Sequence, residues 1–495
     1  MKLKQLCDAA ALECPAGEEE REIEGIATDS RAVGSNFLFV CIQGLHTDGN
    51  TYIAEALKNG AVCVLTEKEP EHRISVPVLR TDSCRRAVAY LYDAWYGFPS
   101  GKLKLIGVTG TNGKTSVTHM LYAMLTASLY RCGIIGTVGY KSVERTLQKR
   151  ASDPLANMTT PDPCELYRVL SEMVEDGVEY VIMEVSSHAL ALEKVAPLHF
   201  SAAVFTNLTP EHLDFHHTME AYAAAKTKLF AQSAFSVINA DSPYAAQMAA
   251  HAVSTCVTCS TTGVADMNAV EISSREDGVE YRISSSRTSL RLSCPIPGDF
   301  TVMNSMQSAI CALHFGCSPS AIKTALASMQ PVRGRMEKVR LGLGADFTVL
   351  IDYAHTPDAL EKLLYTARAI KEPGGRLVIL FGCGGDRDKS KRPVMGAIAS
   401  RLADAVIVTS DNSRSEDPNR IIAEILSGLE GKAEVTVIPD RECAIRKAIL
   451  GARAKDLILL AGKGHEEYEI TREGRRPFSE KQIAIEAFEE RMKQR

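Results

Sequence analysis

Two patterns of apolar positions alternate along the chain. Short runs of consecutive apolar residues, such as 61–66 and 377–381, are typical of strands that are buried on both faces. Between these runs lie longer stretches in which apolar residues recur every three or four positions, as they do on one face of an α-helix. Strands that alternate with helices in this way predict α/β domains with mostly parallel sheets.

The strand candidates fall into three blocks, which predict three domains at residues 1–100, 101–332 and 333–495. Each candidate strand of the third block ends in a polar or Gly-rich loop, and open α/β sheets bind their ligands at that end of their strands. The predicted strands are 36–42 and 61–66 in the first block, 103–108, 178–185 and 202–206 in the second, and 347–351, 377–381, 405–409 and 457–460 in the third.

The composition excludes several classes of protein. The 495 residues are 45% hydrophobic and 24% charged, which is usual for a folded globular chain and rules out disorder throughout. Lys and Arg number 56 against 61 Asp and Glu, which gives a formal net charge of -5, and no dense basic block occurs. We therefore expect neither a nucleic acid nor a membrane as a partner.

The sequence near the N-terminus does not resemble a secretory signal, because Asp8 and Glu13 come before an apolar core could form. No run of 18 uncharged apolar residues occurs either, so we expect a cytoplasmic protein without a membrane span. The 14 cysteines are scattered, as in proteins that keep their thiols reduced. Cys256 and Cys259 form a C-x-x-C pair, but no second pair follows, and a structural zinc ion needs four ligands, so a zinc site is not favoured.

The strongest local signal is the segment GVTGTNGKT at residues 107–115. It follows a predicted strand and precedes a stretch whose apolar residues, from Val117 to Leu125, have helical spacing. A Gly-rich loop between a strand and a helix places backbone N–H groups and the positive end of the helix dipole around a phosphate. Lys114 would contact the terminal phosphates of a nucleotide, and the Thr115 hydroxyl would bind Mg²⁺. The pattern therefore favours an ATP site.

Two alternatives stay open for this loop. Val108 stands where the common phosphate-loop pattern has glycine, so the segment is a variant, and an ordinary Gly-rich turn with a solvated lysine would have the same sequence. The loop by itself also does not distinguish a kinase, a motor, a transporter ATPase and a ligase.

Candidate metal ligands follow two other strands of the second block. Glu184 stands near the end of one predicted strand, where a carboxylate can hold Mg²⁺ beside phosphates. His212, His216 and His217 follow the next strand, and from the residues alone a metal cluster and a group of surface histidines are equally good interpretations. Lys226 lies in an alanine-rich helical stretch, where the residues alone indicate a surface lysine.

A series of motifs extends over nearly the whole chain and resembles the Mur ligases. In order along the chain they are TGTNGKTS, TTPDP, MEVSSHAL, FTNLTPEHLDFH, AAAKTKLF, NADSP, GRME, IDYAHTPDALEKLL, GCGGDRDKSKRP and AGKGHEEYEI. Together they are most similar to those of the family member that adds the third residue of the peptidoglycan stem peptide. The resemblance implies an enzyme that phosphorylates a carboxylate with ATP, after which an amine displaces phosphate from the acyl phosphate and forms an amide.

The resemblance also implies one domain for each substrate. The N-terminal domain would be an α/β domain that binds uridine diphosphate, the central domain a parallel-sheet domain like that of P-loop ATPases, and the C-terminal domain a Rossmann-like domain that binds the amino acid. The implied role is in peptidoglycan synthesis, and hence in cell wall biogenesis, cell shape and cell division. We expect a monomer.

By the same resemblance, Lys114, Glu184, His212 and Lys226 form the catalytic centre, with ATP and Mg²⁺ as cofactors. Thr115 and Glu184 would hold one Mg²⁺, and His212 would help to hold a second. Lys226 matches the carbamylated lysine of the family, and carbamylation would turn its ammonium group into an anionic oxygen ligand for the metal. The residues implied to bind ATP are Gly110, Thr111, Asn112, Gly113, Lys114, Thr115, Ser116, Asn304, Arg335 and Asp352.

The implied carboxylate substrate is UDP-N-acetylmuramoyl-L-alanyl-D-glutamate. Many relatives have arginine where Lys194 stands, and because lysine lacks the bidentate fork of a guanidinium, we expect a looser contact there. Ser30 taken by itself would instead be interpreted as a serine that caps a turn. The residues implied to bind this substrate are Ser30, Leu45, His46, Thr47, Thr159, Thr160, Ser186 and Lys194.

The amine substrate is implied by the segment DNSR at residues 411–414, which is similar to the DNPR motif of relatives that add meso-diaminopimelate. A guanidinium at Arg414 can pair with the distal carboxylate of diaminopimelate, which lysine lacks, so we favour diaminopimelate and keep L-lysine as the alternative. Ser413 replaces the proline of the motif, which removes its restraint on the loop. Taken alone, Arg414 could also pair with Glu416 or Asp417. The residues implied to bind the amino acid are Arg387, Asp411, Asn412, Ser413, Arg414, Gly462 and Glu466.

Other functions remain as alternatives. A ligase for D-alanyl-D-alanine or a folylpolyglutamate synthase would share the phosphate loop but not the DNSR and GKGHE segments. A P-loop ATPase that is not a ligase would account for residues 103–125 alone. A binding protein without catalytic activity is disfavoured, because Lys114, Glu184 and Lys226 are all present.

Overall fold

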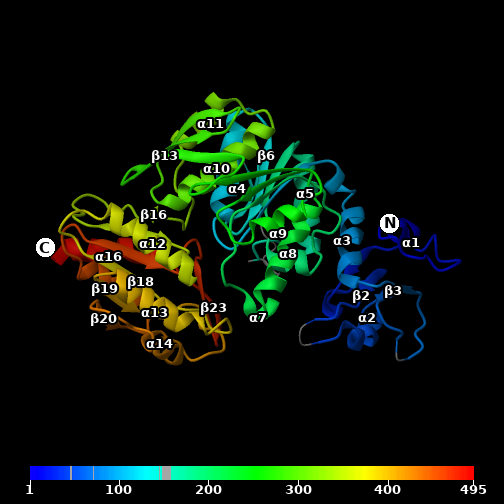
Figure 1. Ribbon diagram of the computed structural model, residues 1–495. Coiled ribbons are helices and arrows are strands. Elements are labelled where there is room, and N and C mark those ends of the chain that lie inside the picture. Colours follow the sequence, from blue (N-terminus) through cyan, green and yellow to red (C-terminus); the bar gives the residue numbers. More distant parts are fainter. Residues whose placement is uncertain (45–46, 71, 144, 148–157, 495) are drawn as a thin grey trace.

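The computed structural model describes residues 1–44, 47–70, 72–143, 145–147 and 158–494. Figure 1 shows three units of sheet and helix side by side, with the N-terminal unit on one side, the C-terminal unit on the other and the central unit between them. Each unit is built on its own sheet, and most neighbouring strands are parallel. The predicted α/β fold class is therefore confirmed. The borders at residues 100 and 332 stay predictions.

The N-terminal unit holds a four-stranded sheet in the order β1-β2-β3-β4, in which each neighbouring pair is parallel. The strands are β1 (Gly25–Ala27), β2 (Phe37–Val40), β3 (Ala61–Thr66) and β4 (Val78–Arg80), and the helices are α1 (Leu3–Ala9), α2 (Ile53–Lys58) and α3 (Cys84–Trp95). Helix α3 begins after Ser83, whose hydroxyl accepts a hydrogen bond from the Arg86 N–H. Its apolar face belongs to a core that continues into the central unit, so the two units share buried surface.

In the described residues the central sheet has 11 strands, in the order β15-β14-β13-β12-β11-β10-β5-β9-β6-β7-β8. The strands are β5 (Lys104–Thr109), β6 (Cys132–Gly136), β7 (Gly139–Ser142), β8 (Arg145–Leu147), β9 (Tyr180–Glu184), β10 (Phe200–Phe205), β11 (Phe235–Asn239), β12 (Thr255–Ser260), β13 (Met267–Arg275), β14 (Gly278–Ser284) and β15 (Ser289–Cys294). The middle strands are parallel and almost entirely buried, as expected of a sheet covered on both faces. Their carboxyl ends place the loops of the candidate site at one edge.

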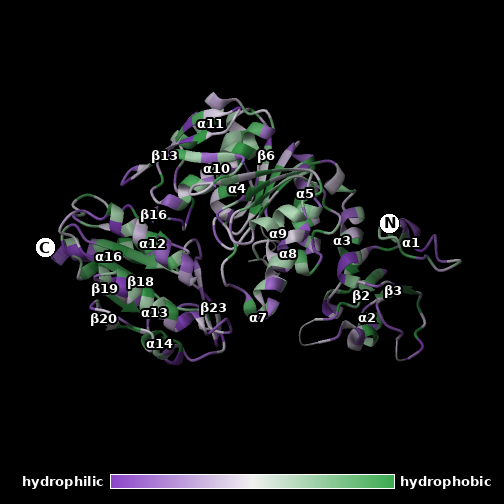
Figure 2. Ribbon diagram, viewed as in Figure 1, coloured by the Kyte–Doolittle hydropathy of each residue, from purple (hydrophilic) through white to green (hydrophobic). Residues whose placement is uncertain are grey.

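Helices cover both faces of the central sheet. They are α4 (Lys114–Ala127), α5 (Pro163–Glu175), α6 (Ser187–Ala191), α7 (Leu213–His216), α8 (Met219–Ala231), α9 (Ala245–Ala250), α10 (Asp299–His314) and α11 (Pro319–Ala327). The apolar side chains of α4, α10 and α11 form one core with the sheet, and those of α5, α6 and α8 form another. Figure 2 shows apolar residues concentrated on the strands and polar residues on the outer helical surfaces.

The C-terminal unit holds a sheet in the order β16-β17-β21-β18-β19-β20, in which only β16 runs antiparallel to its neighbour. Its strands are β16 (Glu337–Lys338), β17 (Thr348–Asp352), β18 (Leu377–Phe381), β19 (Ala405–Val408), β20 (Glu434–Val437) and β21 (Leu457–Ala461), and β22 (Tyr468–Thr471) pairs with β23 (Gly474–Pro477) as a hairpin. Helices α12 (Pro357–Ile370), α13 (Lys391–Leu402) and α14 (Pro418–Leu426) pack on one face, and α15 (Arg441–Leu450) and α16 (Glu480–Gln494) on the other. No helix in the described ranges is both long enough and apolar enough to span a bilayer.

Every predicted strand is present, with small differences at the ends. Strands 61–66 and 377–381 match to the residue. The strand predicted at 36–42 is shorter, because Asn36 has a positive φ of 59°, which lies outside the extended region. The strand predicted at 202–206 begins earlier, at Phe200, which pairs with Leu105 of β5. Pairing between strands, which the apolar pattern does not specify, sets these ends.

Candidate functional site

The phosphate loop predicted at residues 107–115 joins β5 to α4, and its backbone conformation depends on two glycines. Gly110 and Gly113 have φ values of 148° and 87°, where residues with a side chain are strained. A Cβ at Gly110 would lie 1.9 Å from the Thr206 hydroxyl oxygen, and one at Gly113 would lie 2.7 Å from Asn304 Oδ1. The loop therefore needs both glycines for its conformation and for its close packing.

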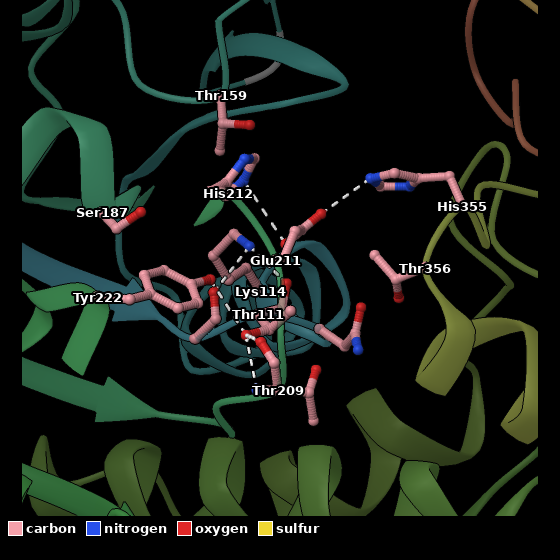
Figure 3. Close-up of polar contacts among 12 residues, drawn as sticks. Thr111, Lys114, Thr159, Ser187, Thr209, Glu211, His212, Tyr222, His355 and Thr356 are labelled. Carbon is pink, nitrogen blue, oxygen red and sulfur yellow. Dashed lines mark hydrogen bonds and ion pairs between the residues drawn. The ribbon is translucent and has the colours of Figure 1, made fainter. Parts of the chain in front are cut away.

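Lys114 begins α4 and stays within the loop. Its Nζ donates hydrogen bonds to the carbonyl oxygens of Gly110, at 3.0 Å, and Thr111, at 2.8 Å. Burial lowers the pKa of Lys114, although nearby Glu211 and Glu184 act in the opposite direction. In Figure 3 the Lys114 side chain lies beside Glu211 and above Thr111. The Lys114 ammonium group thus lies against the backbone carbonyl groups of the loop.

A cavity of about 240 Å³ lies between the phosphate loop and the C-terminal unit. It brings together most of the residues predicted to bind ATP and Mg²⁺, and its apolar wall includes Ile296, Phe300 and Leu363. Gly110 is not among the lining residues. The predicted site residues that line the cavity are Thr111, Asn112, Gly113, Lys114, Thr115, Ser116, Thr159, Glu184, His212, Asn304, Arg335 and Asp352. A polar end and an apolar wall suit a nucleotide, which has phosphates at one end and a base at the other.

Thr115 and Glu184 supply oxygen atoms at one end of this cavity. The Thr115 hydroxyl donates to Glu184 Oε1 at 3.0 Å, and the Thr137 hydroxyl donates to Glu184 Oε2 at 3.0 Å. Glu184 is only 2% exposed, and a Cβ at Gly136 would lie 2.3 Å from its Oε1. Hydroxyl and carboxylate oxygens are the ligands that Mg²⁺ prefers, so this donor set fits the predicted metal.

Lys226 is buried, which makes its interpretation as a surface lysine wrong. It is 1% exposed, and its Nζ donates to the Gly110 carbonyl oxygen at 2.9 Å. Burial lowers its pKa well below the usual value, and the positive charge of Lys114 contributes in the same direction. The alanines next to Lys226 in the sequence do not indicate its burial, because this burial arises from a tertiary contact, the packing of α8 against the phosphate loop. A neutral amine is the form of lysine that reacts with carbon dioxide.

The three histidines after β10 have different environments. His212 Nε2 lies 3.6 Å from Glu211 Oε2, and burial lowers the His212 pKa to about 3, which keeps the ring neutral and able to bind a metal. His216 is buried and hydrogen-bonds through Nε2 to the Ser187 hydroxyl at 2.9 Å, whereas His217 is exposed. Neither a cluster of three metal ligands nor a group of surface histidines describes them. In the described part of the chain, no three His, Cys, Asp or Glu side chains are grouped to hold a metal.

Glu211 and His355 lie at the centre of the site, although sequence reasoning did not select them. His355 Nε2 contacts Glu211 Oε1 at 3.0 Å, and His355 Nδ1 contacts the Tyr353 carbonyl oxygen at 2.8 Å. Burial alone would raise the Glu211 pKa, but the His355 hydrogen bond and the charge of Lys114 lower it, so the group is a carboxylate. Figure 3 shows this pair joining the central and C-terminal units.

Two further contacts join the phosphate loop to the C-terminal unit. Asn112 Nδ2 donates to Asp358 Oδ2 at 2.8 Å, at the start of α12. Arg335 Nη2 donates to the Thr115 hydroxyl at 3.2 Å, and its guanidinium lies 4.5 Å from the centre of the Tyr353 ring. Glu211 and His355 do occur in the quoted segments LTPEHLDFH and IDYAHTP, but only the fold reveals that the two segments meet.

The residues predicted to bind the nucleotide sugar lie in two separate places. Ser30, whose hydroxyl donates to Glu55 Oε2 at 2.6 Å, and Thr47 lie in the N-terminal unit and do not line the cavity. Leu45 and His46 lie outside the described residues.

Of the other residues predicted for this substrate, Thr159 lines the cavity. Thr160 donates to the Glu184 carbonyl oxygen at 2.8 Å and accepts from the Ser186 N–H at 2.9 Å, which ties both residues to the end of β9. Lys194 Nζ pairs with Asp162 Oδ1 at 2.6 Å, so its charge already has a carboxylate partner.

Arg387 and Arg414, both predicted to bind the amino acid, bring two guanidiniums close together. Desolvation and the charge of Arg414 lower the Arg387 pKa. Arg414 Nη1 donates to the carbonyl oxygens of Gly385, at 2.8 Å, and Asn412, at 3.2 Å. None of the ion pairs among the described residues involves Arg414, since Glu416 pairs with Arg392 and Lys389, so the surface salt bridge considered for Arg414 is not present. Two adjacent guanidiniums favour an anionic ligand.

The remaining amino-acid residues form a buried polar network. Asn412 Nδ2 donates to Glu466 Oε2 at 2.8 Å, and Asn412 Oδ1 accepts from Lys463 Nζ at 2.9 Å. A Cβ at Gly462 would lie 2.7 Å from Asp411 Oδ2, which explains the glycine there. Burial and nearby Asp411 raise the Glu466 pKa, and a cationic ligand would relieve that repulsion. Lys463, which sequence reasoning also missed, is fully buried in this network.

The C-x-x-C pair lies away from this site, on β12. Cys256 is half-buried and Cys259 is buried, and both are free thiols. In the part of the chain that the structure describes, neither cysteine belongs to a group of three metal-binding side chains.

Comparisons with known proteins match this architecture. Residues 22–96 match the model of the Mur ligase family catalytic domain, residues 108–312 the Mur ligase middle domain, and residues 334–464 the Mur ligase glutamate ligase domain. The chain is 40% identical to the UDP-N-acetylmuramoyl-L-alanyl-D-glutamate--2,6-diaminopimelate ligase of Syntrophomonas wolfei, with 100% of both chains covered. It is 42% identical to the ligase of the same name from Caldanaerobacter subterraneus, with 96% of both chains covered.

Two solved structures are similar in fold to this chain. A structure of a UDP-N-acetylmuramoyl-L-alanyl-D-glutamate--2,6-diaminopimelate ligase has a TM-score of 0.69 and 29% sequence identity, and the match covers 99% of this chain and 100% of that one. MurF from Acinetobacter baumannii shares the fold, with a TM-score of 0.64, 17% identity and coverage of 99% of this chain and 98% of that one.

Proposed function

This chain belongs to the Mur ligase family, and we propose that it joins meso-diaminopimelate to the γ-carboxylate of D-glutamate in UDP-N-acetylmuramoyl-L-alanyl-D-glutamate. It is an ATP-dependent ligase that forms a carbon–nitrogen bond and acts in peptidoglycan synthesis. The proposed substrate domains are 1–100 for uridine diphosphate, 101–332 for ATP and 333–495 for the amino acid. We also propose that it acts in the cytoplasm as a monomer.

One observation carries this proposal. The phosphate loop and the His355–Asp358 segment meet around a single cavity, and the loops that carry Arg387 and Arg414 end neighbouring strands of the same C-terminal sheet. A ligase needs this arrangement, because its nucleotide and its amine come from different domains but must react at one carboxylate.

In the first step, a γ-carboxylate oxygen of D-glutamate attacks the terminal phosphorus of ATP, ADP leaves and an acyl phosphate forms. Because a carboxylate must approach a triphosphate, charge repulsion opposes this step. Lys114 supplies a positive charge at the loop, and Arg335, which donates to Thr115, supplies a second from the C-terminal unit. Thr115 and Glu184 would hold Mg²⁺, which screens the phosphate charge when it is bound.

Lys226 is proposed to be carbamylated and to join His212 in binding a second Mg²⁺. Its burial and lowered pKa support this, because a neutral amine attacks carbon dioxide and the resulting carbamate is stable only where it is shielded and paired. His212 supports it in the same way, since its lowered pKa keeps the ring in the form that binds metals.

In the second step, an amine of diaminopimelate attacks the acyl carbon and phosphate leaves. Glu466 is proposed to bind an ammonium group of the amino acid, and Arg387 and Arg414 the distal carboxylate. The bidentate pairing of a guanidinium with that carboxylate favours diaminopimelate over L-lysine, because lysine would leave the two guanidiniums without an anion. Ser413, which replaces the proline of the motif, is buried.

The test is ATP-dependent formation of the tripeptide product by the purified protein. With Mg²⁺ and the nucleotide dipeptide, meso-diaminopimelate should give phosphate release and a product whose mass has increased by that amino acid. L-Lysine should give little of either. Turnover with L-lysine instead would reject the specificity, and no turnover with either amine would reject this member of the family.

A further inference from the structure

One arginine is buried behind the two loops of the proposed amino-acid site. Arg441, the first residue of α15, is 1% exposed. Its Nη1 donates to the Ser410 carbonyl oxygen at 2.8 Å, and its Nη2 donates to the Ala461 carbonyl oxygen at 2.7 Å. These carbonyls immediately precede Asp411 and Gly462, which begin the two loops.

The sheet itself does not connect these two loops. They follow β19 and β21, which are separated by β18 in the strand order, so no ladder of backbone hydrogen bonds joins Ser410 to Ala461. The guanidinium of Arg441 reaches across the end of β18 and contacts both carbonyls at once. The planar fork of an arginine suits this task, because its donors point in fixed directions, whereas the single ammonium of a lysine does not have that geometry.

A second buried residue fixes the direction of this fork. Glu480, at the start of α16, accepts from Arg441 Nε at 2.8 Å, and both side chains are fully buried. A buried ion pair is weak evidence for stability, because the cost of removing two charges from water offsets their attraction. The geometry that the pair imposes on the two loops is a better account of its presence.

We propose that Arg441 is a positioning residue for the amino-acid site, held in place by Glu480, and that it sets the spacing between the 411–414 loop and the 462–466 loop. This inference rests on the proposed function for the identity of the ligand. The spacing matters because Asn412 of one loop binds Glu466 of the other at 2.8 Å, and Glu466 is the proposed partner of the substrate ammonium. Arg441 itself does not contact the substrate.

Three variants separate positioning from stability. Arg441→Lys keeps a positive charge beside Glu480 but loses the fork. Arg441→Met with Glu480→Leu removes both charges, and replacing a buried pair by apolar groups of similar size restores stability. Arg491→Met is the matched control, because Arg491 is also buried in the C-terminal unit but donates to the Ile449 carbonyl oxygen at the far end of α15.

The expected result is a change confined to the amino-acid side. Arg441→Lys and the double variant should raise KM for meso-diaminopimelate about 10- to 100-fold and leave KM for ATP within about twofold. The double variant should unfold close to the wild-type temperature, and the Arg491→Met control should keep both KM values. A double variant with the wild-type KM for diaminopimelate, or an equal rise in KM for ATP, would overturn the proposal.

Hydrogen exchange gives a readout that does not depend on the substrate. In the double variant, amides of residues 411–414 and 462–466 should exchange faster than in the wild type, while those of the phosphate loop should not change. Unchanged exchange in both loops would overturn the positioning role. If the wild-type protein has no ligase activity with either amine, the proposed function fails, and this measurement still decides whether Arg441 orders the loops.

Discussion

The phosphate loop and the 411–414 loop both follow parallel strands, but different interactions hold them. The phosphate loop keeps its shape through two glycines with positive φ and through bonds from Lys114 and Lys226 to its own carbonyl oxygens. The 411–414 loop is held by buried charged side chains from distant parts of the chain, among them Arg441 and Lys463. The first loop therefore depends on glycine conformations as well as on side-chain contacts, whereas buried charged side chains from other elements hold the second. Damage to either should affect only its own substrate.

The largest effect should come from removing the Lys114 charge. Lys114→Met should lower kcat by about 10³-fold, because the Lys114 ammonium group lies against two carbonyl oxygens of the loop and its charge stabilises the transferred phosphate. Binding of diaminopimelate should change little. Steady-state kinetics with each substrate varied would show this, with Lys104→Met, at the start of the strand that precedes the loop, as the control. A large rise in KM for meso-diaminopimelate in Lys114→Met would show that the two loops are not independent.

The next effect should be confined to the amino-acid side. Arg414→Ala should raise KM for meso-diaminopimelate about 100-fold and leave KM for ATP unchanged, because it removes one guanidinium of the proposed carboxylate site. The ratio of kcat/KM for diaminopimelate to kcat/KM for L-lysine should also fall. Arg420→Ala, at an exposed arginine nearby, is the matched control. An unchanged ratio of kcat/KM for the two amines in Arg414→Ala would mean that Arg414 does not bind the distal carboxylate.

A smaller effect, on kcat/KM for both ATP and the amino acid, is expected at the contact between the central and C-terminal units. His355→Ala removes the contact with Glu211 and should lower kcat/KM about 10-fold for ATP and for the amino acid alike, since it weakens the docking of one unit on the other. His251→Ala, at an exposed histidine of the central unit, should have no effect. Competition assays with each substrate would measure both values. A loss for one substrate only would place His355 within that substrate's site.

The smallest effect is a change of stability with pH on the amino-acid side. The hydrogen bond from Arg392 lowers the Glu416 pKa to about 2, below the usual value of about 4.3 for an unfolded chain. A lowered folded-state pKa stabilises the protein above the unfolded value, and this contribution is lost as the pH falls from about 4.3 towards 2.

Glu416→Gln should therefore destabilise the protein at pH 7, and the difference from the wild type should shrink as the pH approaches 3. Urea unfolding at several pH values would measure it, and Glu430→Gln, at an exposed carboxylate, should show no such trend. A difference that is constant with pH would contradict the assigned pKa.

The sequence predicted the phosphate loop directly, but it did not predict the contacts that distant segments make around either site. The strand, the glycines and Lys114 are contiguous, so their pattern alone indicated the loop. Lys226 was misjudged from its neighbours, because its burial depends on how α8 packs against Gly110. Glu211 and His355 are 144 residues apart, and Arg441 binds carbonyls that precede two different loops. A sequence pattern does not show such contacts until the fold brings the segments together.

The central claim is that the two regions act on one carboxylate through an acyl phosphate. Its most direct test uses UDP-N-acetylmuramoyl-L-alanyl-D-glutamate labelled with ¹⁸O in the γ-carboxylate, with ATP and meso-diaminopimelate, and mass analysis of the phosphate released. If the carboxylate attacks ATP and the amine then displaces phosphate, each phosphate should contain one ¹⁸O atom from the substrate. Phosphate without ¹⁸O would mean that water hydrolyses ATP separately from the bond that is formed, which would contradict the account.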